Sequence, residues 1–205
     1  MPRYRTTFLL SATSADQFPP PSAPEIAFLG RSNVGKSSML NALLGHPAAR
    51  VSSTPGRTRA INFFAIHAGA RVNPELILAD LPGYGYAKIS RSIREQWPSF
   101  IDPYLAERKM LAACVCVVDM NIPPQPADSV LAEYLENLGR DRIVVGTKAD
   151  KLSGNQRVAA VGRLRKALRV DEILIFSAKD GRGVNELWNT IQNIVATARL
   201  SNDVI

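Results

Sequence analysis

Short runs of apolar residues recur along the chain, each bounded by turn-forming or polar residues. Such near-continuous runs are typical of strands in a sheet that is covered on both faces. Residues 7–12 lie upstream of three consecutive prolines and could form one more short strand or stay irregular. The six predicted strands are residues 25–30, 61–66, 76–80, 112–119, 142–146 and 173–176.

The stretches between these runs have the spacing of amphipathic helices. In one of them, Val158, Val161, Leu164 and Leu168 fall on a common side and predict a buried face. The predicted helices are residues 36–44, 92–108 with interruptions near Pro98 and Pro103, 126–138, 154–169, and a last one from about residue 185. This alternation predicts a three-layer α/β fold, with a mostly parallel six-stranded sheet and helices on both faces.

Length and composition narrow the class of protein. A chain of 205 residues predicts one domain, which we place at residues 25–200, with an N-terminal extension (1–24) and a short tail (201–205). The apolar run at residues 8–10 is shorter than the core of about 7–15 residues that a secretory signal needs. No apolar run approaches the roughly 18 residues of a membrane span. We therefore expect a cytoplasmic protein without a membrane partner.

Charge gives one hint about partners. The 25 Lys and Arg residues exceed the 18 Asp and Glu residues, which gives a formal net charge of +7. Most of the basic excess lies in residues 1–110. Such an uneven charge is typical of a protein that binds nucleic acid, although a solvated basic surface would give the same imbalance. The basic residues of the 154–169 helix are expected to form a solvated face rather than an RNA-binding site. Cys114 and Cys116 alternate along a predicted strand and are expected to pack as small apolar residues.

The segment from Gly30 to Ser37 has the phosphate-loop pattern G-x-x-x-x-G-K-S, directly after a strand and at the start of a helix. Its backbone N–H groups are expected to bind phosphate oxygens, helped by the helix N-terminus. Lys36 would neutralise the β and γ phosphates, and the Ser37 hydroxyl would bind Mg²⁺. The residues assigned to this loop are Gly30, Arg31, Ser32, Asn33, Val34, Gly35, Lys36, Ser37 and Ser38.

Two later segments predict guanine rather than adenine as the base. The Asp150 carboxylate, at the end of Thr147-Lys148-Ala149-Asp150, can accept hydrogen bonds from the guanine N1–H and 2-amino groups, which adenine lacks. After the last strand, backbone N–H groups of Ser177 and Ala178 are expected to bind the guanine carbonyl, with Lys179 along the base. Phe176 completes this predicted set.

Two further segments lie between the phosphate loop and the base-binding segments. In the segment Asp80-Leu81-Pro82-Gly83, Asp80 ends a buried strand and is the predicted second-sphere Mg²⁺ ligand, and the Gly83 N–H could sense a γ-phosphate. Residues 54–58 supply Gly56, Arg57 and Thr58, and Thr58 is the candidate for a second hydroxyl on Mg²⁺, with Thr54 as its alternative. The catalytic candidates are Lys36, Thr58 and Gly83.

Together these motifs resemble the EngB family (also called YihA or YsxC) of bacterial GTPases, over roughly residues 8–200. The residues that carry the resemblance are 30–40, 54–58 with 61–64, 80–88, 147–150 and 177–178. The resemblance implies a Ras-like P-loop GTPase, expected as a monomer, which binds GTP, GDP and Mg²⁺. It also implies a role in assembly of the large ribosomal subunit, with ribosomal RNA and proteins as partners, and thereby in growth and cell division. Residues 119–128 depart from the usual family sequence.

Two positions bear on hydrolysis. Ras-like hydrolases have a glutamine directly after the D-x-x-G motif to orient the attacking water, but this chain has Tyr84, so we expect slow hydrolysis that depends on a partner. Asn33 resembles a potassium-binding asparagine of related GTPases, or it simply stabilises the turn. A P-loop kinase or ATPase, and a guanine-nucleotide-dependent scaffold without relevant hydrolysis, are the alternatives.

Overall fold

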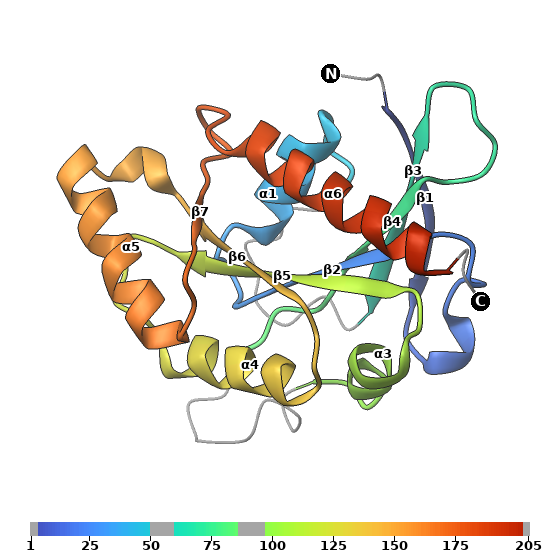
Figure 1. Ribbon diagram of the computed structural model, residues 1–205, viewed down its shortest axis with the longest axis horizontal. Coiled ribbons are helices and arrows are strands. Elements are labelled where there is room, and N and C mark those ends of the chain that lie inside the picture. Colours follow the sequence, from blue (N-terminus) through green and yellow to red (C-terminus); the bar gives the residue numbers. More distant parts are fainter. Residues whose placement is uncertain (1–3, 50–59, 86–96, 203–205) are drawn as a thin grey trace.

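The computed structural model describes residues 4–49, 60–85 and 97–202, and these form one seven-stranded sheet between two layers of helices (Figure 1). The strand order is β1-β3-β4-β2-β5-β6-β7; β3 is antiparallel to both of its neighbours, β1 and β4, and the other neighbouring strands are parallel. The strands are β1 Tyr4–Ala12, β2 Glu25–Gly30, β3 Ile61–Ala68, β4 Leu76–Asp80, β5 Leu111–Asp119, β6 Arg142–Thr147 and β7 Leu174–Ile175.

The described helices cover both faces of the sheet, as predicted. Buried residues of α1 and α6 pack on one face, and those of α3, α4 and α5 pack on the other (Figure 1). The helices are α1 Lys36–Leu44, α3 Ile101–Glu107, α4 Pro126–Asn137, α5 Gly154–Leu168 and α6 Val184–Asn202, with short 3-10 turns at Ala15–Gln17 and Ala149–Lys151. No helix in these ranges has both the length and the apolar character needed to cross a membrane.

The strands alternate their side chains between the two cores because successive residues of a strand point to opposite faces. In β2, Ile26 and Phe28 face the α1–α6 layer, whereas Ala27 and Leu29 face the other layer. Cys114 and Cys116 are both buried in the second core, on the same face of β5, as the sequence predicted. Burial raises the pKa of the Cys116 thiol to about 12, so this thiol stays neutral.

The sheet has one strand more than the six that the sequence predicted. Tyr4–Ala12 forms β1 and pairs antiparallel with β3, with a register shift between Phe8 and Leu10. The Tyr4 ring also packs edge-on against Trp188 of α6, with 5.2 Å between the ring centroids. The segment that the sequence left open between strand and irregular structure is therefore a strand.

Two helix predictions need correction. In the described part of the predicted helix 92–108, residues 97–100 form a bend and a turn and α3 begins at Ile101, so the predicted interruption near Pro98 is confirmed. The predicted interruption near Pro103 is wrong, because Pro103 lies in the first turn of α3, where proline is tolerated. In α5, the predicted apolar side includes Val158, which is 74% exposed. Ala160 is buried beside Leu164 instead, so the helix is rotated relative to the predicted face.

Candidate functional site

The predicted motifs meet at one edge of the sheet. Strands β4, β2, β5, β6 and β7 run parallel, so their carboxyl ends lie on the same side. In open α/β sheets, this is the edge where ligands bind.

The phosphate-loop motif forms a tight turn between β2 and α1. Asn33 and Gly35 adopt left-handed backbone conformations, with φ of 62° and 105°. Gly30 leaves no room for a side chain, because a Cβ there would lie 2.9 Å from the Val117 carbonyl oxygen. The first turn of α1 contains no acidic residue, and Gly35 at its N-cap has no side-chain cap. This geometry suits an anion, since the first N–H groups of a helix lack partners within the helix.

The carboxyl end of β4 lies directly beside this turn. Lys36 and Asp80 are both buried, and the Lys36 Nζ donates a hydrogen bond to Asp80 Oδ1. Ser37, the next residue of α1, is half-buried. An ammonium group, a carboxylate and a hydroxyl therefore lie together at the N-terminus of α1.

The segment after Asp80 is held against the phosphate-loop turn by its backbone. Ser32 N–H donates to the Tyr84 carbonyl oxygen at 3.2 Å, and Tyr84 N–H donates to the Gly30 carbonyl oxygen at 3.4 Å. Gly83 lies so close that a Cβ there would be 2.8 Å from the Ser32 Oγ. The predicted phosphate-sensing residue therefore lies against the predicted phosphate loop.

Tyr84 occupies the position of the Ras-like glutamine, and its side chain is buried. Its hydroxyl donates to Asp128 Oδ1 of α4 at 3.0 Å, and its ring packs edge-on against Trp97 with centroids 5.9 Å apart. Burial, reinforced by the Asp128 charge, raises the pKa of Tyr84 well above its usual value. The phenol is thus a neutral hydrogen-bond donor that points into the protein core.

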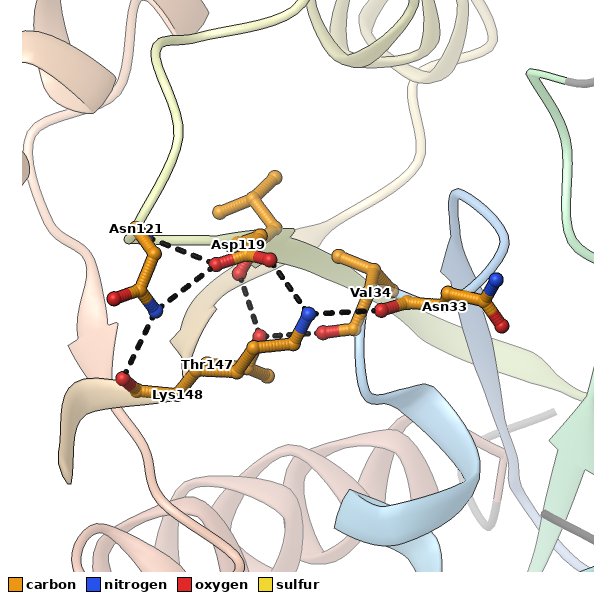
Figure 2. Close-up of polar contacts among 7 residues, drawn as sticks. Asn33, Val34, Asp119, Asn121, Thr147 and Lys148 are labelled. Carbon is orange, nitrogen blue, oxygen red and sulfur yellow. Dashed lines mark hydrogen bonds and ion pairs between the residues drawn. The ribbon is translucent and has the colours of Figure 1, made fainter. Parts of the chain in front are cut away.

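The segment 147–150 contacts the phosphate-loop turn through its first two side chains. Thr147 Oγ1 lies 2.6 Å from the Val34 carbonyl oxygen, and Lys148 Nζ donates to the Asn33 carbonyl oxygen at 2.9 Å. Lys148 Nζ also donates to Asp119 Oδ2 at 2.6 Å, as Figure 2 shows. The structure therefore joins two motifs that are more than a hundred residues apart in sequence.

The last two predicted segments are joined at Asp150. Ser177 Oγ donates to Asp150 Oδ1 at 2.9 Å, and Ser177 Oγ accepts the backbone N–H of Lys179 at 3.2 Å. Ala149 N–H donates to the Phe176 carbonyl oxygen at 3.1 Å. Ala178 and Lys179 also line a hollow of about 660 Å³ together with residues of α1 and the turn after it: Ser38, Asn41, Ala42, Gly45, His46 and Pro47.

The structure brings together most of the predicted site, but not all of it can be placed. Gly56, Arg57 and Thr58, with the alternative Thr54, lie outside the described residues, so their roles stay predictions. Leu81 and Pro82 follow Asp80 at the site edge, and Leu81 is buried.

Sequence reasoning missed three polar residues near the site. Asp119 and Asn121 surround Lys148, and Asp128 accepts the Tyr84 hydroxyl. Asp119 carried a usable signal, because a carboxylate at the carboxyl end of a parallel strand lies at the ligand edge of the sheet.

The fold and the phosphate-loop turn define the class as a P-loop nucleotide-binding protein. A family model described as "50S ribosome-binding GTPase" matches residues 25–148. A probable GTP-binding protein EngB of Acidobacterium capsulatum is 58% identical over 192 residues, covering 93% of this chain and 91% of the relative. One of Koribacter versatilis is 52% identical, covering 95% and 96%. The chain belongs to the EngB family of GTP-binding proteins and is a GTPase.

Solved structures agree with this assignment. The crystal structure of a probable GTP-binding protein EngB has a TM-score of 0.67 and 26% identity, and the match covers 84% of this chain and 99% of that one. Aquifex aeolicus Era bound to GDP and aluminium fluoride has a TM-score of 0.68 at 24% identity, covering 85% and 57%, which shows the shared fold alone. The predicted Ras-like fold class is confirmed.

Proposed function

We propose that this GTPase binds GTP and GDP with Mg²⁺, hydrolyses GTP slowly, and acts as a switch in assembly of the large ribosomal subunit in the cytoplasm. Through that role it would be needed for normal growth and cell division. The observation that carries the proposal is the convergence of the phosphate-loop turn, Asp80 and the Asp150–Ser177 pair at one sheet edge.

Phosphate binding would fall to the turn before α1 and to Lys36. The first N–H groups of α1, which have no partner within the helix, suit phosphate oxygens, and Lys36 adds a buried positive charge beside them. The side chains of Ser37 and Asp80 offer a hydroxyl and a carboxylate, which are the oxygen ligands that Mg²⁺ prefers, so the residues present fit this ion. Thr58 is proposed as the further hydroxyl ligand. Bound Mg²⁺ would neutralise charge on the β and γ phosphates.

Base selection would fall to Asp150. Ser177 Oγ donates to one oxygen of its carboxylate and so fixes the orientation of the group. An oriented carboxylate favours a base with two adjacent donors, and guanine has them where adenine does not. This argues against the alternative of a P-loop kinase or ATPase. A thermal-shift comparison of GDP with ADP separates the two, because only the preferred nucleotide should raise the melting temperature strongly.

Slow hydrolysis is proposed from the position of Tyr84. Its hydroxyl is engaged by Asp128 and its ring is buried, so it supplies no polar group to orient an attacking water. Potassium bound near Asn33 is one proposed source of help, since it would place beside the phosphates the positive charge that an arginine finger supplies in other GTPases. A ribosomal partner is the other.

The ribosomal role is supported by the family description and by the basic composition of the chain. We further propose a partner-docking surface made of Arg57, Arg59, Lys88, Arg91 and Arg94, which lie within or next to the two segments expected to respond to GTP and outside the described residues.

The test is single-turnover GTP hydrolysis with and without large-subunit particles, using small-subunit particles as the control. A GTPase switch predicts acceleration by large-subunit particles alone. Nucleotide-dependent binding to the particles without acceleration would favour the scaffold alternative, and absence of binding would contradict the ribosomal role.

A further inference from the structure

Asp119 ends β5, the strand that lies between the strand leading to the phosphate loop and the strand leading to the guanine motif. Its side chain is only 11% exposed, and both of its carboxylate oxygens accept hydrogen bonds. Oδ2 accepts the Lys148 Nζ at 2.6 Å. Oδ1 accepts the backbone N–H of Asn121 at 2.9 Å and the Asn121 side-chain amide at 3.2 Å.

Lys148 is held at both ends by this arrangement (Figure 2). Its ammonium group bridges Asp119 and the Asn33 carbonyl oxygen of the phosphate-loop turn. Its own carbonyl oxygen accepts the Asn121 side-chain amide at 3.1 Å. The backbone of Lys148 is left-handed, with φ of 59°, an uncommon conformation for a non-glycine residue. These contacts fix a residue whose backbone would otherwise favour other conformations.

We propose that Asp119 is a positioning residue for guanine-nucleotide binding, which holds Lys148 so that the phosphate loop and Asp150 keep a fixed spacing. The inference rests on the proposed role of Asp150 in guanine recognition. Asp119 itself does not contact the nucleotide; it acts through Lys148, with Asn121 as its support.

The charge of Asp119 is central to this role. Burial raises the pKa of this carboxyl, but hydrogen bonds from Lys148 and Asn121 outweigh burial and leave the pKa below its usual value. Asp119 is therefore ionised at neutral pH, and Lys148 faces a full negative charge. An amide in its place would lose the ion pair and could turn an N–H donor toward the ammonium group.

The test compares Asp119→Asn with Asp141→Asn, which makes the same chemical change at an exposed residue before the amino end of β6, away from the site. GDP affinity and dissociation rate are measured with a fluorescent GDP analogue. Loss of a charge-assisted hydrogen bond should weaken binding roughly 10- to 100-fold, through faster dissociation. Asp141→Asn should bind like wild type. Equal affinity of Asp119→Asn and wild type would overturn the proposal.

A double-mutant cycle with Lys148→Met separates positioning from a general structural role. If Asp119 acts through Lys148, Asp119→Asn should add little to the loss caused by Lys148→Met. Full additivity of the two losses would overturn the proposal. If Asp119→Asn does not fold, Asn121→Ala takes its place in both experiments and should give a smaller loss of the same kind. If wild type bound ADP as tightly as GDP, the proposed guanine specificity would be refuted. That result is distinct from the affinities of the Asp119 variants, so the two proposals can fail separately.

Discussion

Arg108 is expected to be a major source of stability far from the nucleotide edge. Glu25, at the amino end of β2, is fully buried, and Arg108 Nε lies 3.0 and 3.1 Å from its two carboxylate oxygens. Arg108 Nη2 also donates to the Pro19 carbonyl oxygen at 2.6 Å. The Tyr104 hydroxyl donates to Glu25 at 2.9 Å. The group ties the segment before β2 to the end of α3.

Arg108→Met keeps most of the side-chain length but, among the residues that the structure describes, leaves the Glu25 carboxylate with Tyr104 as its one side-chain donor. Breaking a buried ion pair from one side costs about 3–5 kcal/mol, because the remaining charge stays buried. At roughly 2–4 °C per kcal/mol for a chain of this size, the melting temperature should fall by roughly 6–20 °C. GDP affinity of the folded protein should not change, because Glu25 lies at the opposite end of β2 from the phosphate loop.

Thermal and urea unfolding without nucleotide measure this effect. Arg71→Met is the matched control, because Arg71 is largely exposed and its pair with Glu75 should contribute about 0–1 kcal/mol. Glu25→Gln combined with Arg108→Met should be more stable than Arg108→Met alone, since no unpaired charge remains. An Arg108→Met protein within 1 kcal/mol of wild type (roughly one surface pair) would refute the reasoning.

Three further predictions concern the site. Burial raises the pKa of Asp128 despite the Tyr84 hydrogen bond, so the free energy of unfolding of wild type should fall as pH rises through that pKa. Asp128→Asn has no such carboxyl and should therefore gain stability relative to wild type between pH 4 and pH 7. A difference in urea unfolding that does not depend on pH would contradict this. Lys36→Ala should weaken GDP binding by loss of charge, whereas Ser37→Ala should make affinity less dependent on magnesium; wild-type titrations for both would mean that the phosphate loop is misassigned. GTP hydrolysis should be faster in potassium than in sodium at equal ionic strength, and Asn33→Ala should abolish the difference. A difference that persists in Asn33→Ala would mean that Asn33 only stabilises the turn.

Local signals predicted most of the fold. The bounds of β2 and the start of α1 follow from an apolar run, a glycine and a helix-forming segment, all within 20 residues. Strand β1 could not be assigned because its residues pair with residues of β3 that lie 49 to 64 positions later in the chain, and because Phe8 and Leu9 are exposed. The rotation of α5 was missed because Ala160 is a weak apolar signal beside Val158.

The candidate site was predictable where one segment carries the chemistry, as at Lys36 and Asp80. Contacts between segments were not. Lys148 reaches Asn33 and Asp119 only because β5 and β6 are neighbours in the sheet. The Tyr84–Asp128 hydrogen bond likewise needs α4 to pack over the segment after β4, and no sequence spacing reports that.

The most direct test of the account is the base preference of Asp150→Asn. Calorimetric titration of wild type and variant with GDP and with xanthosine diphosphate measures it. The proposed site predicts that wild type prefers GDP and that the variant prefers the xanthine nucleotide, because an amide donor faces a base carbonyl where the carboxylate faced the guanine amine. A variant that keeps the wild-type affinity for GDP would contradict the assignment of Asp150 to guanine recognition.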